Sequence, residues 1–394
     1  MILTKKQEEG LKICLDRFKN KEKYSIISGY AGTGKSTLVK FIIQALADYG
    51  INPDRDVAYA CFTGKAAQVL LKKGNKNVYT LHKLLFESIP KPDGTFYRKP
   101  KPAIPYKIIV VDEVSMAPND LLRLLFRHNV YIIALGDPFQ LPVIDKDQDN
   151  GLLNTPHVFL DEIMRQALDS EIIQLSMKIR NYEPFTYYKG TDVMVLPKNE
   201  LNTGMLQWAD QILVGTNATR VNINNQMRML SNKGPHPENG DKVICLRNYW
   251  DVFADNDDPL VNGTIGYIGN CYSTYNQTPH WINGGQTFPV LSADFISDTD
   301  AYFGRLQMDE TEIITGKRCL DYKTIYRLSG NPRTAHLVPM EFTYGYAITC
   351  HKAQGSSWPN ILIIEENFPF EREEHARWLY TAVTRSEEKL VLIR

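Results

Sequence analysis

Apolar residues in this chain form short continuous runs, each followed by polar or helically spaced residues, which is the pattern of strands that alternate with helices. Runs of this kind predict strands that are buried on both faces, as in a parallel sheet. In the first half of the chain they lie at 24–28, 57–62, 107–111 and 131–135. The pattern therefore predicts an α/β layer that ends near residues 150–165.

Two helical stretches accompany these strands. Apolar residues recur at helical spacing over 38–49, and Gly50 is a typical helix C-cap. A second helical region is predicted from Phe159 to Arg180. Near the N-terminus, Thr4-x-x-Gln7 before an apolar run has the form of a capping box on an amphipathic helix.

The second half of the chain repeats the α/β pattern around a segment of different character. Strands are predicted at 211–215, 241–246, 361–364 and 390–393, with a helix over 372–384. Between them, residues 264–340 consist of short β-prone runs (TIGYIG, TFPVLSADFI, TEIIT) that are broken by Gly, Asn and Asp. This texture predicts a small β-barrel or antiparallel insert.

A small hairpin is predicted at residues 86–101. Pro92-Asp93-Gly94 separates two short β-prone runs, because proline fixes φ and glycine accepts a positive φ. Phe96 and Tyr97 follow the tip and point to opposite faces of a strand. An aromatic residue here either packs against the domain or offers a surface on which a nucleic-acid base stacks.

Composition limits the possible classes of protein. No apolar run among the 394 residues approaches membrane-spanning length, and the N-terminal MILTKKQ lacks the apolar core of a signal peptide. The six cysteines are scattered without a C-x-x-C pair, which favours reduced thiols and a cytoplasmic location. Because the formal net charge is zero, any nucleic-acid binding must rest on local residues.

The most specific motif is GYAGTGKS at 29–36, a phosphate-binding loop between a predicted strand and a predicted helix. Glycines let the loop curl so that backbone N–H groups point at phosphates, at the positive end of a helix. Lys35 is expected to reach the β- and γ-phosphates, and Ser36 to bind Mg²⁺. The nucleotide-binding candidates in the loop are Gly29, Gly32, Thr33, Gly34, Lys35, Ser36 and Thr37.

Two carboxylates follow the apolar strand at 107–111. Ligands of α/β sheets bind at the carboxyl ends of strands, so Asp112 is a candidate Mg²⁺ ligand and Glu113 a candidate base for the attacking water. Acidic residues also favour helix N-termini, but a strand downstream of a phosphate loop favours catalysis. In GDPFQLP, Gln140 is a candidate sensor of the γ-phosphate, although loop glutamines are commonly only solvated.

Taken in order, the motifs GYAGTGKS, TGKAA, VVDEVS, GDPFQLP, EIMRQ, ITCHKAQG and YTAVTRS resemble those of a superfamily 1 helicase. They are most similar to the RecD and Dda branch, which moves 5′ to 3′ on single-stranded DNA. The resemblance implies two RecA-like P-loop domains, with a β-hairpin pin in the first and a small SH3-like β-barrel insert in the second. The implied domains are 1–165, then 166–263 with 342–394, and the insert at 264–341.

The resemblance also implies roles for single residues. Gln7 resembles a glutamine that reads adenine, and Arg165 and Arg385 resemble arginine fingers that reach the phosphates across the domain cleft. Gly355 lies in the motif that links the second domain to the nucleotide. The implied DNA contacts are Thr63, Lys65, Thr80 and His82 in the first domain, and Asn217, Thr349 and His351 in the second. The strand-separating pin contributes Phe96.

The resulting expectation is an ATP- and Mg²⁺-dependent DNA helicase that acts on single-stranded and forked duplex DNA. It is expected to function as a monomer and not to associate with a membrane. Single-strand-binding or replication proteins are expected as further partners. A translocase that displaces proteins without unwinding DNA is the alternative, and RNA as substrate stays open. A P-loop kinase would leave the second half without a role, and the intact Lys35, Asp112, Glu113 and Arg385 disfavour a non-catalytic scaffold. RecD carries an additional N-terminal domain, whereas the adenine-reading helix begins here at residue 4, which favours a free-standing enzyme like Dda.

Overall fold

The computed structural model describes residues 3–90, 96–142, 146–255, 259–331, 333–369 and 371–394. The chain divides into two compact units. Unit 1 comprises Met1–Phe86, Pro100–Leu201 and Ala353–Arg394, and unit 2 comprises Glu87–Lys99 and Asn202–Lys352. This is a division by compactness, so the predicted domain boundaries at 165, 263 and 341 stay predictions.

Unit 1 contains a six-stranded sheet in the order β3-β2-β6-β7-β1-β8, and the strands pair in parallel. The strands are β1 (Tyr24–Gly29), β2 (Val57–Cys61), β3 (Val78–Thr80), β6 (Ile108–Val111), β7 (Tyr131–Gly136) and β8 (Val158–Leu160). Four of them lie where apolar runs predict strands, which confirms the α/β pattern. Because β6, β7 and β1 are neighbours, the loops after these strands share one edge of the sheet.

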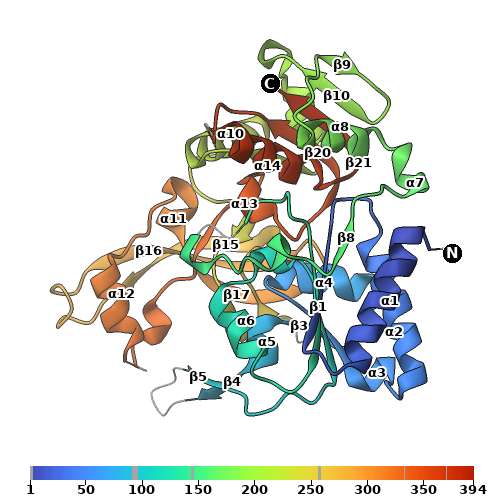
Figure 1. Cartoon of the computed structure of the whole chain (residues 1–394). Helices are drawn as coiled ribbons and strands as arrows, with labels where there is room; N and C mark the ends of the chain where they lie inside the picture. The colour runs from blue at the N-terminus through green and yellow to red at the C-terminus, as the bar shows by residue number, and fades with distance from the viewer. Residues whose placement is uncertain (1–2, 91–95, 143–145, 256–258, 332, 370) are drawn as a thin grey trace. The chain divides into compact units, whose positions relative to one another are not determined.

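Helices cover both faces of this sheet (Figure 1). Ile27 and Ile133 pack with Leu38 on one face, whereas Ile26 and Ile132 belong to the cluster on the opposite face, because side chains alternate in a strand. The helices of this layer are α1 (Lys5–Lys19), α2 (Lys35–Leu46), α3 (Pro53–Asp56), α4 (Gly64–Lys72), α5 (Leu81–Leu85) and α6 (Asn119–Leu125). Short 3₁₀ turns lie at η1 (Ala47–Tyr49), η2 (Val114–Met116), η3 (Lys146–Gln148) and η4 (Leu152–Asn154).

A second set of strands in unit 1 runs in the order β20-β21-β10-β9. The first two pairs are parallel, and β9 joins in antiparallel orientation. The elements here are α7 (Arg165–Leu168), α8 (Glu171–Arg180), β9 (Tyr188–Lys189), β10 (Val193–Leu196), η5 (Lys198–Glu200), β20 (Trp358–Ile364), α14 (Arg372–Val383) and β21 (Ser386–Ile393). Helix α14 is buried along most of its second half, including Trp378 and Tyr380.

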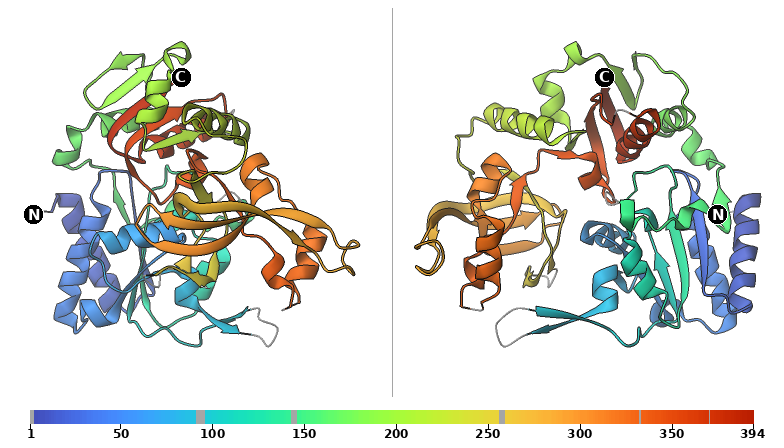
Figure 2. Two further views of the ribbon diagram at one scale, coloured as in Figure 1. Left: turned by 180° about the vertical axis from the view of Figure 1, so that it is seen from behind. Right: turned by 60° about the vertical axis from the view of Figure 1, so that its left-hand side comes forward.

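Unit 2 is built around a five-stranded antiparallel sheet in the order β17-β16-β15-β12-β18. Its longest strands, β15 and β16, pair along a ribbon (Figure 2). The strands of unit 2 are β11 (Gln211–Val214), β12 (Lys242–Cys245), β13 (Tyr249–Phe253), β14 (Pro259–Leu260), β15 (Ile265–Gln277), β16 (Thr287–Ser297), β17 (Tyr302–Asp309), β18 (Phe342–Tyr344) and β19 (Ala347–Thr349). Its helices are α9 (Thr203–Trp208), α10 (Asn217–Leu230), α11 (Glu310–Thr315), α12 (Tyr322–Ser329) and η6 (Ala335–Leu337), and α13 (Cys350–Ala353) follows.

The structure corrects two predicted elements. The TEIIT run, predicted as β-prone, forms helix α11, because the Asp309 side chain accepts from Glu312 N and caps the first turn at 3.0 Å. Phe159, predicted to start a helical region, lies in strand β8, and the helices begin only at α7 and α8. In addition, β12 and β18 belong to the antiparallel sheet, so this sheet is larger than the predicted insert.

The predicted hairpin is present as β4 (Phe86–Pro90) and β5 (Phe96–Pro100), which pair in a two-stranded sheet. Its turn, Pro92-Asp93-Gly94, lies outside the described residues. All six cysteines are free thiols. Within the described ranges, each helix is too short or too polar to cross a lipid bilayer.

Candidate functional site

The carboxyl ends of three adjacent strands bring the predicted nucleotide residues together. The glycine-rich loop follows β1, Asp137 follows β7, and Asp112 follows β6. Parallel strands present their carboxyl ends at one edge of a sheet, which is where α/β folds bind ligands. The strand order therefore assembles the candidate site.

The glycine-rich loop has the backbone that its sequence predicts. Gly32 and Gly34 have φ of 76° and 79°, values that glycine adopts without steric cost. A Cβ at Gly29 would lie 2.7 Å from the carbonyl oxygen of Leu160, so a side chain does not fit there. The Lys35 Nζ donates to the carbonyl oxygens of Gly29 at 2.7 Å and Tyr30 at 2.9 Å, which holds the ammonium over the loop.

Gln7 forms the predicted capping box and also contacts the glycine-rich loop. It completes the capping box of α1, where its Oε1 accepts from Thr4 N at 3.0 Å. Its buried amide also reaches the glycine-rich loop, because Nε2 donates to the carbonyl oxygen of Thr33 at 3.2 Å. Cap and loop are thus connected through one side chain.

Asp112 and Glu113 form a sharp turn at the end of β6. Glu113 has φ of 50° and ψ of 47°, a left-handed conformation that is uncommon outside glycine. The Asp112 Oδ1 accepts from Glu113 N at 2.9 Å and stabilises this turn. Burial and the neighbouring charge of Glu113 raise the pKa of Asp112 to about 6, and the ammonium of Lys35 opposes the rise.

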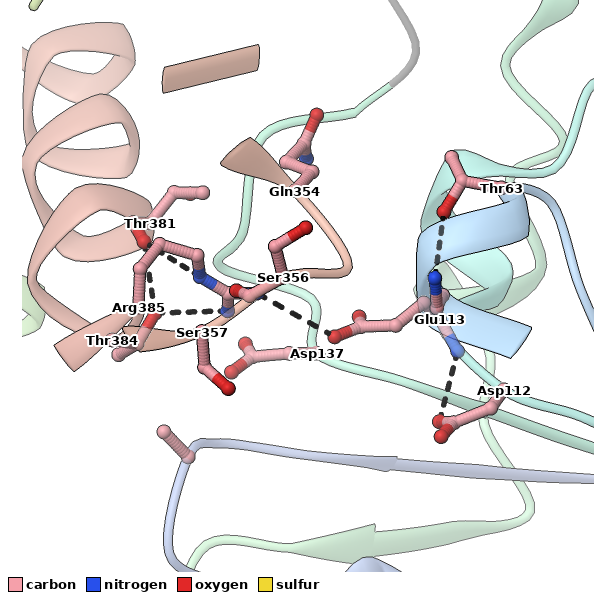
Figure 3. A network of polar contacts seen from close by, with 12 residues as sticks. Thr63, Asp112, Glu113, Asp137, Gln354, Ser356, Ser357, Thr381, Thr384 and Arg385 are labelled. Carbon is pink, nitrogen blue, oxygen red and sulfur yellow. Dashed lines mark hydrogen bonds and ion pairs between the residues drawn. The ribbon is translucent and has the colours of Figure 1, made fainter. Parts of the chain in front are cut away.

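Arg385 is a buried cation that points at Glu113, as Figure 3 shows. Its guanidinium donates to the carbonyl oxygens of Thr381 at 3.1 Å and Ser356 at 3.4 Å, which fixes its plane. Its NH1 atom lies 4.0 Å from Glu113 Oε1. The two residues belong to the same compact unit although they are far apart in sequence.

Gln140 lies between these two charges. With its amide oriented to satisfy both neighbours, its nitrogen donates to Glu113 Oε2 at 3.2 Å and its oxygen accepts from Arg385 NH2 at 3.0 Å. Gln140 is buried, so it is not a solvated loop residue. Three predicted site residues therefore form one hydrogen-bonded chain.

Further polar residues of the site were not singled out from the sequence. The Tyr380 hydroxyl donates to the Asp137 carboxylate at 2.6 Å and accepts from Ala31 N at 2.9 Å. Leu141 N donates to Thr381 Oγ1 at 2.9 Å. Asp137 follows an apolar strand in the same way as Asp112, and this signal is visible in the sequence. Tyr380 is the first residue of the YTAVTRS motif, but the motif alone does not indicate what its hydroxyl bonds.

The donor set fits a magnesium ion that is shared with a nucleotide. Ser36 contributes a hydroxyl in the first, exposed turn of α2, and Asp112 contributes a carboxylate. Among the described residues, no group of three or more His, Cys, Asp or Glu side chains could bind a metal ion. Mg²⁺ commonly takes one or two protein ligands and completes its shell with phosphate and water, so these two residues are sufficient.

Comparison with known proteins agrees with the order of these motifs. The AAA domain family matches residues 3–190, and the UvrD-like helicase C-terminal domain family matches residues 344–393. The ATP-dependent RecD2 DNA helicase of Deinococcus radiodurans is 26% identical over 393 residues, covering 92% of this chain and 46% of that protein. The ATP-dependent DNA helicase Dda of Enterobacteria phage T4 is 28% identical over 192 residues, covering 45% of this chain and 43% of that protein.

Over these regions the chain is similar to helicases of the RecD and Dda type. A Bacteroides Pif1 helicase in complex with ADP-AlF3 and single-stranded DNA superimposes with a TM-score of 0.51 at 19% identity, covering 100% of this chain and 92% of that chain. The matches span less than half the length of the two curated relatives named above, at 46% and 43%.

The residues that helicase motifs assign to DNA lie on both units. In unit 1, Thr63 and Thr80 are the N-caps of α4 and α5, with their hydroxyls accepting from Ala66 N and Lys83 N at 3.2 Å each. Lys65 is buried in the first turn of α4. The remaining residue of this group, His82, lies between the rings of Phe62 and Phe86.

In unit 2, Asn217 begins α10 with an exposed side chain, whose oxygen accepts from Arg220 Nε at 3.2 Å. Thr349 ends β19, and burial lowers the pKa of the neighbouring His351. No structure tests these assignments to DNA, so they stay predictions.

Of the three remaining predicted residues, the structure describes the surroundings of one. Gly355, with φ of 74°, sits where a Cβ would lie 3.0 Å from Ala66 Cβ and 3.1 Å from Thr63 Oγ1. Gly355 therefore lets the backbone pass close to α4. Arg165 begins α7 and Phe96 begins β5, but their side chains lie outside what the structure describes.

Proposed function

We propose that this chain is an ATP-dependent DNA helicase that moves 5′ to 3′ on single-stranded DNA and unwinds duplex DNA. The observation that carries the proposal is the chain Glu113–Gln140–Arg385 beside the phosphate-binding loop. A nucleotide-binding scaffold would not need a carboxylate, an amide and a buried guanidinium aligned at the end of a phosphate loop.

Each residue has a role in phosphoryl transfer to water. Lys35 and the N–H groups at the start of α2 bind the β- and γ-phosphates. Glu113 orients the attacking water and accepts its proton, and Gln140 positions the Glu113 carboxylate for this step. Arg385 stabilises the charge that develops on the transferred group. Ser36 and Asp112 would hold Mg²⁺, which when bound neutralises phosphate charge.

Gln7 is proposed to read the adenine base, because its amide is buried next to Thr33 and Gly34 of the loop. Arg165 is proposed as a second cation toward the phosphates, on the basis of its motif. Both assignments concern ATP as the substrate. The reduced cysteines favour work in the cytoplasm.

The DNA-directed parts of the proposal rest on motifs and on two structural features. The β4–β5 hairpin is proposed as the strand-separating pin. The antiparallel sheet of unit 2 is proposed to be an SH3-like barrel insert. Thr63, Lys65, Thr80, His82, Asn217, Thr349 and His351 are proposed to contact single-stranded DNA. Forked duplex DNA is the proposed substrate of unwinding by a monomer, with single-strand-binding or replication proteins as partners.

The test measures two activities of the same preparation. ATP hydrolysis is followed with and without single-stranded DNA or RNA, and unwinding is followed on a duplex with a single-stranded tail. DNA-stimulated hydrolysis together with unwinding is expected, and Lys35→Ala serves as the inactive control. Stimulated hydrolysis without unwinding would identify a translocase instead, and stimulation by RNA alone would replace the substrate class.

A further inference from the structure

The loop after β7 is bonded to the C-terminal segment of unit 1 at nearly every residue. The Asp137 carboxylate accepts from Tyr380, and the carbonyl oxygen of Pro138 accepts from Arg377 NH1 at 3.0 Å. The Leu141 backbone bonds on both sides, donating to Thr381 and accepting from Gln354 Nε2 at 2.6 Å. Gln140 is left to face Glu113 and Arg385. The loop and α14 therefore behave as one body.

Tyr380 extends this body to the phosphate-binding loop. Its hydroxyl is both a donor to Asp137 at 2.6 Å and an acceptor from Ala31 N at 2.9 Å. Burial, with the Asp137 charge, raises the pKa of Tyr380 well above its ordinary value, so the phenol keeps the proton that it donates. The ring is 1% exposed and meets Phe139 edge-on at 5.2 Å between centroids. One oxygen atom thus joins three motifs of the site.

The position of Tyr380 along the chain gives this bond a consequence for the chemistry. Arg385 follows it by five residues, immediately after α14, and a helix advances about 1.5 Å per residue. Fixing Tyr380 against Ala31 therefore fixes the axial position of α14 relative to the phosphate loop. Arg385 inherits that position, since its recorded hydrogen bonds run to Thr381, Ser356, Thr384 and Gln140, and none of these residues belongs to the phosphate loop.

The α8 helix supports the same arrangement from a second side. The guanidinium of Arg180 lies 3.7 Å from the ring centroid of Tyr30, the loop residue before Ala31. Tyr30 also meets Phe159 edge-on at 5.4 Å. In the first part of the phosphate loop, α8 thus contacts the side chain of Tyr30, and α14 bonds the backbone of Ala31. Thr33 to Ser36 remain the part that is expected to face the phosphates.

We infer that Tyr380 is a positioning residue for ATP hydrolysis: its hydroxyl fixes α14 to the phosphate loop and so places Arg385 against Glu113. The inference rests on the proposed ATP hydrolysis and adds a residue that the helicase motifs leave without a role. Tyr380 does not touch the reacting atoms, so it acts through Arg385. Loss of the hydroxyl should lower turnover and leave ATP binding largely intact.

The matched control is a tyrosine whose hydroxyl is equally well bonded but remote from the loop. The Tyr131 hydroxyl lies 2.6 Å from Ser25 Oγ and donates to the carbonyl oxygen of Cys14 at 3.0 Å. Tyr131 is 6% exposed in the same unit. Tyr131→Phe therefore removes a comparable set of buried hydrogen bonds and reports the effect of destabilisation alone.

The experiment is a double-mutant cycle on the full chain. Steady-state ATP hydrolysis with saturating single-stranded DNA is measured for wild type, Tyr380→Phe, Arg385→Ala and the double variant, by release of radiolabelled phosphate. We expect Tyr380→Phe to lower kcat by about 10- to 100-fold with KM for ATP changed less than about 3-fold. In the Arg385→Ala background the same change should have almost no further effect, because the group that Tyr380 positions is gone.

The controls make the outcomes distinct. Tyr131→Phe should leave kcat within about 2-fold of wild type. Its fold-change in kcat should be the same in the Arg385→Ala background, so that the two effects multiply. The inference is overturned if the fold-changes in kcat of Tyr380→Phe and Arg385→Ala also multiply, or if Tyr380→Phe raises KM and leaves kcat unchanged. In either case the hydroxyl is structural and the helicase proposal stands. A wild-type chain that does not hydrolyse ATP would overturn both.

Discussion

At the scale of single residues, the site keeps an unfavourable backbone conformation where its chemistry needs one. Glu113 adopts a left-handed conformation that costs a non-glycine residue about 1–2 kcal/mol. The Asp112 carboxylate and the following 3₁₀ turn hold it there. The turn directs the carboxylate toward Gln140 and Arg385, so local strain accompanies the placement of the residue that is proposed as the base.

Glu113→Gln should abolish turnover while ATP binding is retained. The amide is nearly isosteric, but it cannot accept the proton of the attacking water, so kcat should fall by about 100-fold or more. Hydrolysis and the affinity for a fluorescent ATP analogue are measured together. Glu22→Gln, a remote surface change, should leave both unchanged. Near-wild-type hydrolysis by a folded Glu113→Gln variant would remove Glu113 from the mechanism.

Arg385→Ala should abolish DNA-stimulated hydrolysis and leave DNA binding without nucleotide near wild type. Arginine fingers contribute about 10³-fold or more to turnover. Arg385→Lys keeps the charge but loses the planar fork that bonds Thr381 and Ser356, so it should recover only part of the activity. DNA affinity is measured by anisotropy of a labelled strand. Normal hydrolysis in the Ala variant would exclude the finger.

What the sequence revealed at this scale depended on how local the signal is. Gln7 and Glu113 lie in short patterns whose chemistry is readable without a fold. Tyr380 bonds residues that precede it by 349 and 243 positions, and a pairing over that distance has no sequence signature in one chain. The role of Gln140 was open from sequence, and burial between two charges now supports a role in the site.

At the scale of elements, apolar continuity predicted the buried strands correctly, whereas short mixed runs were misread. The TEIIT run has β-prone residues, but acidic residues fill the first turn of α11 and Gly316 ends it with φ of 72°. Caps and the helix dipole outweigh weak residue propensity in a helix of six residues. The D-E-T-E…G pattern was the available signal.

The contact between α14 and the segment that follows β20 should depend on pH through His375. Its Nε2 lies 2.9 Å from Glu365 Oε1, and this bond raises the pKa of His375 above its ordinary value. A raised pKa in the folded state means stabilisation that is complete below the unfolded value of about 6.5 and lost as pH rises through the folded value. Arg394 also contacts Glu365, at 3.2 Å.

His375→Gln should therefore lower the urea midpoint more at about pH 5.5 than at about pH 9. His280→Gln, a change at an exposed residue, is the control and should leave the urea midpoint unchanged at both pH values. A stability difference between wild type and His375→Gln that grows with pH would contradict the assigned ion pair.

The hairpin allows a prediction that separates unwinding from translocation. If Phe96 is the surface on which the last base pair stacks, Phe96→Ala should reduce duplex unwinding by about 10-fold, since stacking contributes about 1–3 kcal/mol per base. Single-stranded-DNA-stimulated hydrolysis should stay near wild type. Tyr97→Ala, on the opposite face of the strand, is the matched control and should have the smaller effect. Equal loss of all activities would leave the hairpin as structure only.

At the scale of the whole molecule, zero formal net charge means that DNA affinity must come from local groups. The motifs could predict an α/β protein with an inserted β segment, because motif order reflects strand order. The motifs could not predict the two compact units, because these depend on which segments pack together although they are far apart in the sequence. Unit 1 combines three separate segments for that reason.

Direction of movement is a property of the whole molecule, and 5′ to 3′ is expected. Unwinding of a duplex with only a 5′ single-stranded tail should be efficient, and a duplex with only a 3′ tail should remain intact. A blunt duplex of the same sequence controls for fraying. The reverse preference would contradict the expected polarity without affecting the assignments of Glu113 or Arg385.

The order in which segments enter unit 1 has a consequence during synthesis on the ribosome. The phosphate loop emerges early, but Tyr380 and Arg385 lie in the segment after Lys352, beyond the whole of unit 2. A nascent chain that is halted before Ala353 contains every residue of unit 2 and lacks the segment that joins α14 to the loop. Because such distant contacts form slowly, we expect the contact between α14 and the phosphate loop to form only after translation has passed the inserted unit. A chain that is halted before Ala353 lacks Arg385, the proposed arginine finger.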